Sequence, residues 1–200
     1  KLRKHVSTPL VANTRDLSHK DGEKLLEAGF SGAYHAIRLG EGKDTPFTIK
    51  TRMHTIQVLK DVGLKWMNCV EPLGPEHKPE EIVDLMFLAR DYKATYSGVM
   101  RRINFPGSPM QNYGMISERD LSKVVAVSRL VMGDVPKAHC THEPHSSSLM
   151  SGANLFFPEV GSNPRDDEGQ VQGGRGRPIL MTRNIQQEMN LDPDLPSNCF

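Results

Sequence analysis

Two short stretches of the chain gather side chains that could do chemistry. The first is Arg38-Leu-Gly-Glu41, in which an arginine and a glutamate flank a glycine. A guanidinium can bind a carboxylate through two parallel hydrogen bonds, and a glutamate can accept from an ammonium group or from ribose hydroxyls. The pair therefore suits an amino-acid-like or nucleoside ligand, although a salt bridge between two surface residues explains it equally well.

The second stretch, His139-Cys-Thr-His-Glu-Pro-His145, is dense in residue types that bind metals. It lacks the ligand spacing of a structural zinc site. In a strand, His139 and Thr141 face one way while Cys140 and His142 face the other, so the possible ligands do not converge. We expect a substrate contact that lines a barrel and assign no metal ligand. A bound metal and a plain structural histidine are the alternatives.

Short apolar runs alternate with amphipathic segments along the chain, which predicts repeated β–α units that position these residues. We expect strands at residues 5–12, 32–37, 64–70, 96–103, 136–142 and 153–160. Helices are expected between them, near residues 18–29, 49–63, 79–89, 117–128 and 147–151. Their end signals are the capping pairs Ser18/Asp21 and Ser117/Asp120, the stops Gly29 and Gly63, and Pro79 in a first turn.

Such alternation implies parallel strands with helical crossovers. A closed eight-stranded barrel usually needs about 250 residues, and this chain has 200. The α/β fold is therefore either an open sheet or a partial (β/α) TIM-type barrel that lacks two β–α units, and the pattern alone leaves both open. The segment after Gly161 is rich in Gly, Asp, Gln and Pro, so we expect an extended wrap or partial disorder, with only residues 181–189 helical.

Polar side chains follow the expected strands at their carboxyl ends, where parallel α/β folds bind ligands. We expect a ligand pocket at this rim. The side chains are Asn13, Arg15 and Asp16, then Arg38 and Glu41, Cys69 and Glu71, Arg101, Arg102 and Asn104, the His139–His145 stretch, and finally Glu159, Ser162 and Asn163.

Composition excludes some classes of function. The net charge is +1, the basic residues are scattered and aromatic residues make up 6%, so a nucleic-acid surface is not expected. No apolar run approaches the roughly 20 residues that span a bilayer. Cys69, Cys140 and Cys199 are too widely spaced for a disulfide framework or a zinc ribbon. Reduced thiols in a cytoplasmic protein are the expectation.

Four motifs, in this order, resemble the biotin-synthase-like radical S-adenosylmethionine enzymes. Residues 29–41 resemble the fourth strand of that family, and Glu71-Pro-Leu-Gly-Pro-Glu76 resembles a glycine-bearing stretch that follows. Phe105-Pro-Gly-Ser-Pro109 is similar to the Gly-Thr-Pro turn after the sixth strand. Residues 136–154, which end in Ser-Gly-Ala-Asn, resemble the next β–α–β piece. The resemblance covers residues 6–165, most of the chain.

Three motifs resemble one branch in particular, the radical protein associated with [Fe]-hydrogenase and the related [FeFe]-hydrogenase maturase. They are Arg38-Leu-Gly-Glu41, Ala138-His-Cys-Thr-His-Glu-Pro144 and Gly161-Ser-Asn-Pro-Arg-Asp166.

The resemblance implies a radical enzyme that generates a deoxyadenosyl radical for cofactor biosynthesis from a small-molecule substrate, with no nucleic-acid or membrane partner. Its cofactors are S-adenosylmethionine and a [4Fe-4S] cluster held by three closely spaced cysteines, which this sequence lacks. The first two β–α units would be missing, so the cluster would be bound by an absent N-terminal part or by a separate cluster-bearing chain. Residues 1–165 would form the partial barrel and 166–200 a tail, and the chain would be inactive alone.

By the same resemblance, Arg38 and Glu41 hold the methionine portion and ribose of S-adenosylmethionine. The other implied contacts are Glu71 and Arg102 nearby, Pro106, Gly107 and Ser108 in the turn beside the adenine, and Asn13, His139 and Thr141 in the substrate cavity. Two other classes of function remain open. One is a non-catalytic barrel subunit or binding module. The other is a metal-dependent α/β-barrel hydrolase that uses His139, His142, Glu143 and His145.

Overall fold

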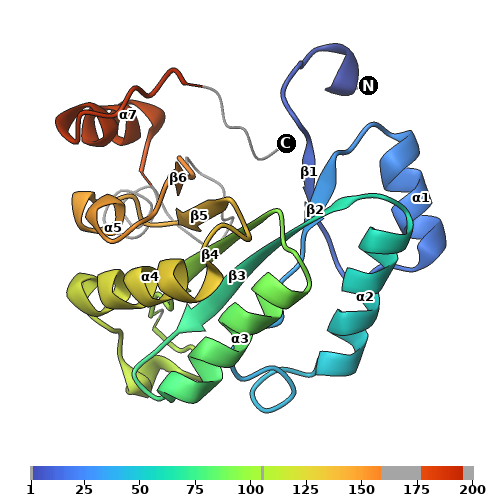
Figure 1. Ribbon diagram of the computed structural model, residues 1–200. Helices are drawn as coiled ribbons and strands as arrows, with labels where there is room; N and C mark the ends of the chain where they lie inside the picture. Colours follow the sequence, from blue (N-terminus) through green and yellow to red (C-terminus); the bar gives the residue numbers. More distant parts are fainter. Residues whose placement is uncertain (1, 105, 159–176, 196–200) are drawn as a thin grey trace.

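The fold, seen in a computed structural model, is a six-stranded parallel sheet that curls into a half-barrel (Figure 1). The structure describes residues 2–104, 106–158 and 177–195. The strands pair in chain order, from β1 to β6. They are β1 (Val11–Asn13), β2 (Gly32–Tyr34), β3 (Lys65–Leu73), β4 (Tyr96–Arg101), β5 (Ala138–Thr141) and β6 (Leu155–Phe156). This confirms the expected partial (β/α) TIM-type barrel.

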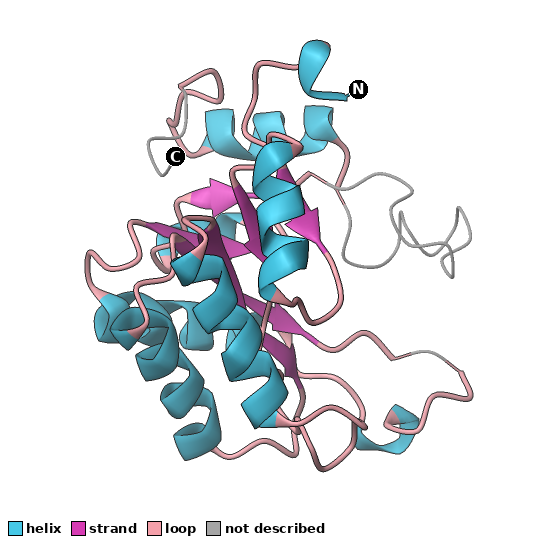
Figure 2. Cartoon of the chain, turned by 90° about the vertical axis from the view of Figure 1, so that its right-hand side faces the viewer, coloured by secondary structure: helices cyan, strands magenta, loops and turns pink. Residues whose placement is uncertain are grey.

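The α-helices between consecutive strands pack on the outer face of the curled sheet (Figure 2). They are α1 (His19–Glu27), α2 (Ile49–Asp61), α3 (Pro79–Asp91), α4 (Glu118–Met132) and α5 (Ser146–Met150). The other helices are η1 (Leu2–Lys4) before β1, η2 (Gln111–Tyr113) before α4, and α7 (Ile179–Glu188) after β6. The sequence signals for their ends are confirmed: Ser18 and Asp21 form a capping box on α1, Ser117 caps α4, and Pro79 opens α3. None of the helices described here has the length and apolarity needed to cross a membrane.

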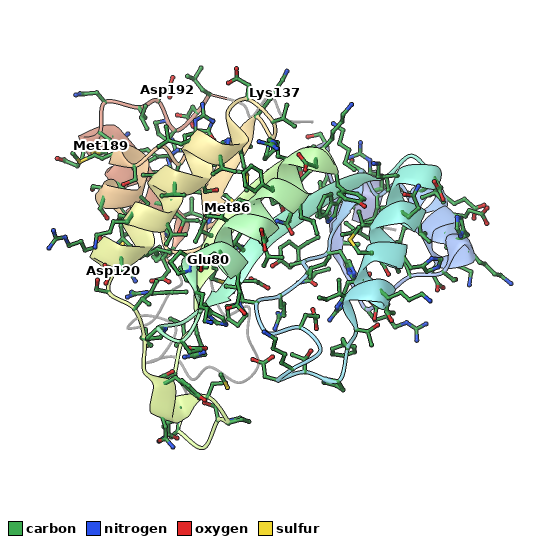
Figure 3. All side chains as sticks on the ribbon, turned by 60° about the horizontal axis from the view of Figure 1, so that its bottom comes forward. Glu80, Met86, Asp120, Lys137, Met189 and Asp192 are labelled. Atoms are coloured by element: carbon green, nitrogen blue, oxygen red, sulfur yellow. The ribbon has the colours of Figure 1, made fainter. Side chains whose placement is uncertain are left out.

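Side chains alternate between two buried faces of the sheet. Trp66, Val70 and Val99 face the helices and join the main core, in which Met86 of α3 is fully buried (Figure 3). Met67 faces the inside of the half-barrel, in a second cluster with residues of β4 and β5. Both faces are covered, so burial is nearly continuous along β3 and complete along β5, as in parallel sheets generally.

The expected strands at the two edges of the sheet are shorter in the structure. The first strand was expected over residues 5–12, but β1 is only Val11–Asn13 because β2 offers just three residues for pairing. At the other edge, β6 is Leu155–Phe156. Several predicted features lie outside the described residues. They are the end of the expected last strand, the boundary at residue 165, and the side chains of Glu159, Ser162, Asn163 and Cys199. The expected helix at 181–189 is confirmed as α7.

Candidate ligand site at the carboxyl edge of the sheet

A cavity of about 280 Å³ opens where the first three strands end. It lies at the carboxyl edge of the sheet, where parallel β/α folds bind their ligands. Of the residues that the sequence assigned to a site, Asn13, Arg38 and Glu71 line this cavity. The complete lining is Asn13, Thr14, Tyr34, His35, Ala36, Arg38, Thr45, Phe47, Arg52 and Glu71.

Arg38 and Glu71 form an ion pair in this cavity. Glu71 belongs to β3, where strand alternation after Met67 and Cys69 turns its side chain to the inside of the half-barrel. The pairing of β3 with β4 shifts register just beyond it, an irregularity that is common beside functional sites. Arg38 Nη2 lies 3.2 Å from Glu71 Oε1, and the arginine keeps an exposed fraction of 48%. Its guanidinium can therefore still donate hydrogen bonds to a ligand.

Two further side chains meet Glu71 from the inside of the half-barrel. The Tyr34 hydroxyl and the Cys69 thiol both hydrogen-bond with its carboxylate. Burial, reinforced by the negative charge of Glu71, raises the pKa of Tyr34 and that of Cys69 well above their ordinary values. Both groups are therefore neutral hydrogen-bond donors, and the buried charge of Glu71 is compensated by them and by Arg38.

Glu41 is buried in the loop beside the cavity and does not line it. Its carboxylate accepts from the Arg38 backbone N–H (3.2 Å), the Thr45 hydroxyl (2.6 Å) and Arg52 Nε (3.2 Å). These bonds use its oxygens to fix the loop that follows β2. Glu41 thus holds Arg38 in place through the backbone, and its predicted direct contact with a cofactor has no support in this geometry.

Arg52 connects that loop to the first β–α turn. Its guanidinium contacts Glu41 and, through Nη1, Asp16 Oδ1 at 3.2 Å. Asp16 is held there because the neighbouring Leu17 N–H donates to the buried Thr55 hydroxyl one turn further along α2. Sequence reasoning missed Arg52, which looks like a solvated helix residue. The available signal is its place in the first turn of a helix that follows a strand, because such turns lie at the carboxyl edge.

His35 is buried against the ion pair between Arg52 and Asp16. Its Nε2 lies 3.4 Å from Asp16 Oδ1, and its side chain is 3% exposed. Burial and the positive charge of Arg52 lower its pKa to about 4. The imidazole is therefore neutral near pH 7. Phe47 completes this wall, with the Arg52 guanidinium 4.4 Å from its ring centroid and 46% of the residue exposed.

Four predicted cofactor contacts lie away from the cavity. Arg102 forms a two-pronged ion pair with Glu76 and donates to the Gly114 carbonyl at 3.1 Å. The hydrogen bond from Arg102 lowers the pKa of Glu76. The predicted adenine turn, Pro106, Gly107 and Ser108, precedes η2 in a segment that projects from the body of the molecule (Figure 3). Phe105 lies outside the described residues.

The predicted substrate contacts on β5 face the helices. His139 Nε2 lies 3.2 Å from the carbonyl of Gly133, which ends α4. Thr141 is fully buried, and its hydroxyl pairs with the backbone of Glu143. The predicted alternation along the strand is present, but the prediction chose the wrong face. Ala138 and Cys140 are the β5 residues on the inside, and His142, just after the strand, contacts Tyr34 there.

The histidines of residues 139–145 do not converge. The His142 ring stacks on Phe157 with centroids 5.2 Å apart, whereas His145 Nδ1 lies 3.6 Å from Glu118. Glu143 instead accepts from Arg101 Nε at 2.6 Å. Within residues 2–104, 106–158 and 177–195, no group of three or more His, Cys, Asp or Glu side chains is placed to hold a metal. The hydrolase alternative therefore lacks its predicted centre.

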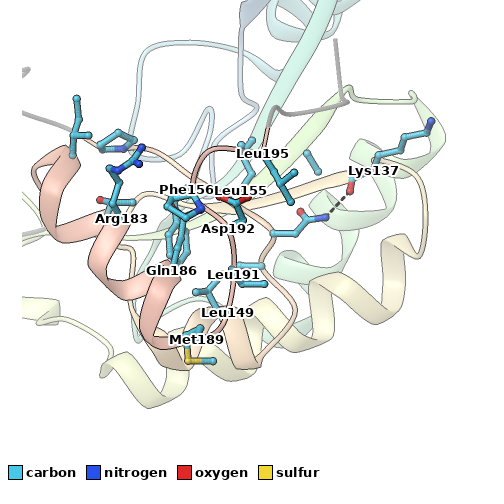
Figure 4. Close-up of a pocket in the computed structure, with 17 residues that line it drawn as sticks. Lys137, Leu149, Leu155, Phe156, Arg183, Gln186, Met189, Leu191, Asp192 and Leu195 are labelled. Atoms are coloured by element: carbon cyan, nitrogen blue, oxygen red, sulfur yellow. Dashed lines mark hydrogen bonds between the residues drawn. The ribbon is translucent and has the colours of Figure 1, made fainter.

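A larger groove of about 660 Å³ lies between α7 and the start of β5 and β6 (Figure 4). Lys137 and Asn154 lie at one end of it, where Asn154 Nδ2 donates to the Lys137 carbonyl at 3.0 Å. Gln186 and Arg183 of α7 line the other side. This groove is at the amino ends of its strands, the edge that serves stability rather than catalysis in β/α barrels. We therefore take the smaller cavity as the candidate site.

No protein-family model and no curated protein sequence matches the chain. Solved structures do. Methylornithine synthase superposes with a TM-score of 0.73 at 15% identity, over 97% of this chain and 61% of that one. A maturase of the [FeFe]-hydrogenase superposes with a TM-score of 0.61 at 13% identity, over 79% of this chain and 39% of that one. A type I 3-dehydroquinate dehydratase from Clostridium difficile superposes with a TM-score of 0.56 at 13% identity, over 94% of this chain and 71% of that one. The chain thus has the fold of these proteins and spans less than two thirds of the first two.

Proposed function

We propose that the chain is the S-adenosylmethionine- and substrate-binding portion of a radical enzyme that generates a deoxyadenosyl radical for cofactor biosynthesis. The observation that carries this proposal is the half-exposed Arg38 in a cavity at the carboxyl edge, with the buried Glu71 behind it. The fold supports it, because one structural neighbour is an [FeFe]-hydrogenase maturase, the class that the sequence motifs resemble.

The cavity residues fit S-adenosylmethionine by type. Arg38 binds the carboxylate of the methionine portion, and the Asn13 amide and Thr14 hydroxyl, which also line the cavity, hydrogen-bond the amino and ribose groups. Phe47 offers a flat, half-exposed face to the adenine. The volume of about 280 Å³ is just below the range of about 300–1,000 Å³ that is usual for ligand pockets. When bound, S-adenosylmethionine supplies the deoxyadenosyl group that becomes the radical.

The cysteines of this chain do not fit a [4Fe-4S] cluster. The sequence has no three closely spaced cysteines. Cys69 and Cys140 are buried on neighbouring parts of the sheet, and the described residues contain no group of three metal-binding side chains. We therefore assign the cluster to an N-terminal segment or a separate chain and route no step through the residues described here.

Titration calorimetry of this chain with S-adenosylmethionine tests the proposal. Arg38→Ala should weaken binding by roughly one to two orders of magnitude, because a hydrogen bond to a charged group contributes about 1.5–3 kcal/mol. Arg38→Lys should recover little, since lysine lacks the two-pronged geometry. Arg119→Ala, which removes an exposed arginine from α4, is the matched control. Equal affinities for the wild type, Arg38→Ala and the control would overturn the assignment, as would no binding by the wild type.

A binding module without chemistry is the second candidate, favoured by the missing cysteine triplet. The two candidates differ in what happens to bound S-adenosylmethionine. If the chain is part of a radical enzyme, the wild type releases 5′-deoxyadenosine when a cluster-bearing partner and a reductant are added. The Arg38→Ala variant should then lack this activity. A binding module retains S-adenosylmethionine unchanged under the same anaerobic conditions.

A further inference from the structure

Two buried thiols face each other across a glycine on the inside of the half-barrel. The strand register pairs Cys69 of β3 with Gly98 of β4, and Gly98 with Cys140 of β5. Residues that are paired in neighbouring parallel strands present their side chains to the same face. The two cysteines therefore point the same way, with no side chain between them. They are 0% and 2% exposed.

The missing side chain of Gly98 is what brings the sulfurs together. A Cβ atom placed on Gly98 would lie 2.4 Å from Cys140 Sγ and 3.4 Å from Cys69 Sγ. The distance between the two sulfurs cannot exceed the sum of these values. A metal ion that binds two thiolates at about 2.3 Å holds the sulfurs about 3.8–4.6 Å apart, depending on the angle at the metal, which is within this limit.

The same geometry excludes a disulfide. The two cysteines are separated by two strand spacings, so their Cα atoms are about 9.6 Å apart. Cysteines with Cα atoms more than about 7 Å apart cannot be joined without moving the backbone. Neither residue forms a disulfide in the structure. The geometry thus permits a shared ion and excludes a disulfide.

We propose that Cys69 and Cys140 form a two-thiolate site for a soft monovalent cation, with Cu⁺ as the expected metal. Thiolate ligands favour Cu⁺, zinc and Fe–S clusters over the harder biological cations. Zinc and Fe–S centres need about four ligands, and the described part of the chain holds no group of three or more His, Cys, Asp or Glu side chains placed to bind a metal. The proposal does not depend on the proposed function, because neither cysteine is assigned to S-adenosylmethionine.

Metal binding at this pair exchanges protons for an ion. When Cu⁺ enters, two S–H bonds break and two S–Cu bonds form, and both protons leave to solvent. Binding should therefore tighten as the pH rises.

The cavity at the carboxyl edge supplies the route to the thiols. Tyr34 and Glu71 line that cavity, and both interact with Cys69. An ion that enters beside Arg38 thus reaches Cys69 first and Cys140 next. Apolar side chains surround the pair on the inner face, including Met67 and Tyr96, so a bound ion is shielded from water.

The test uses the whole chain with Cys199→Ser, which leaves Cys69 and Cys140 as the only thiols. Anaerobic titration of Cu⁺ against a chromogenic Cu⁺ chelator should give one ion per chain. Cys69→Ser and Cys140→Ser should each lower the affinity on the order of 100-fold or more, because one of the two sulfur ligands is lost. Gly98→Ala should do the same with both thiols present, since its Cβ would occupy the space beside Cys140 Sγ.

Two results would overturn the proposal: no stoichiometric binding by the Cys199→Ser chain, or unchanged affinity in both serine variants. Should the variants fail to fold, X-ray absorption at the copper edge of the Cys199→Ser chain decides. Two sulfur ligands and no others support the site, whereas nitrogen or oxygen ligands contradict it.

Discussion

Arg38 Nη2 lies 3.2 Å from Glu71 Oε1, yet the arginine side chain is 48% exposed and the glutamate 2%. The pair thus reaches from the cavity mouth to the inside of the half-barrel. A ligand carboxylate can approach the exposed side of Arg38 while Glu71 holds the guanidinium from behind. The same carboxylate meets Tyr34 and Cys69, so the candidate ligand site and the buried thiols share Glu71.

The first prediction concerns the strength of this ion pair. Arg38→Ala should lower the free energy of unfolding by about 1 kcal/mol, because the exposed arginine is screened but the buried Glu71 loses its cation. In a Glu71→Gln background the same substitution should cost close to nothing. Urea denaturation of the wild type, the two single variants and the double variant gives the coupling energy between Arg38 and Glu71. Additive effects of the two substitutions would show that the contact contributes nothing to stability.

The second prediction concerns Arg52, which is shared by Glu41 and Asp16. Arg52→Met should lower the free energy of unfolding by about 3–5 kcal/mol, since it leaves the fully buried Glu41 without its cation. Arg52→Lys should cost less but not restore the wild type, because one ammonium cannot reach both carboxylates in the same way. Arg119→Met on the exposed face of α4 should change stability by about 0.5 kcal/mol or less. A small loss for Arg52→Met would contradict the role of this network.

The sequence predicted the fold well because local signals agreed with each other. Capping residues and glycine stops marked the helices, and the alternation of elements implied a parallel sheet. The edges were less predictable. Residues 5–12 look like a strand, but a strand extends only as far as its neighbour offers partners, and β2 is three residues long. That length depends on tertiary structure and is not encoded locally.

The candidate site was predicted only in part, and for a specific reason. Alternation along β5 separated His139 from Cys140, but it could not say which of the two faces the inside, since both faces are buried. Polarity suggested His139, whereas the helices cover that side. Arg52 was missed because it comes from a helix, and only the packing of α2 over the first β–α turn brings it to the cavity.

The third prediction concerns Trp66, the single tryptophan of the chain. Its buried Nε1–H donates to the His35 carbonyl at 2.7 Å, which fixes the chain where it leaves β2 for the cavity. Trp66→Phe should lower the free energy of unfolding by about 1–3 kcal/mol, because a buried carbonyl loses its donor. Circular dichroism during urea denaturation measures the loss. Phe87→Leu, at an exposed position on α3, is the control. Equal stability of Trp66→Phe and the wild type would contradict this role.

The last prediction concerns the pH dependence of stability that His35 produces. Burial and Arg52 lower its folded pKa to about 4, whereas the ordinary value is 6.5. Between these values the unfolded chain binds more protons than the folded chain, so acid favours unfolding. The contribution of His35 is fully present above pH 6.5 and is lost as the pH falls toward 4. Its slope is at most about 1.4 kcal/mol per pH unit.

His35→Asn isolates this contribution, because an amide of similar size does not titrate. The burial that lowers the pKa of His139 and His145 adds its own acid sensitivity to every variant, so the difference between two proteins is the informative quantity. Urea denaturation from pH 4 to pH 7 should give a shallower slope for His35→Asn than for the wild type. Phe87→Leu, at an exposed position on α3 that carries no titratable group, should keep the wild-type slope. Parallel curves for His35→Asn and the wild type would mean that folding leaves the pKa of His35 unchanged, with Asp16 offsetting burial and Arg52.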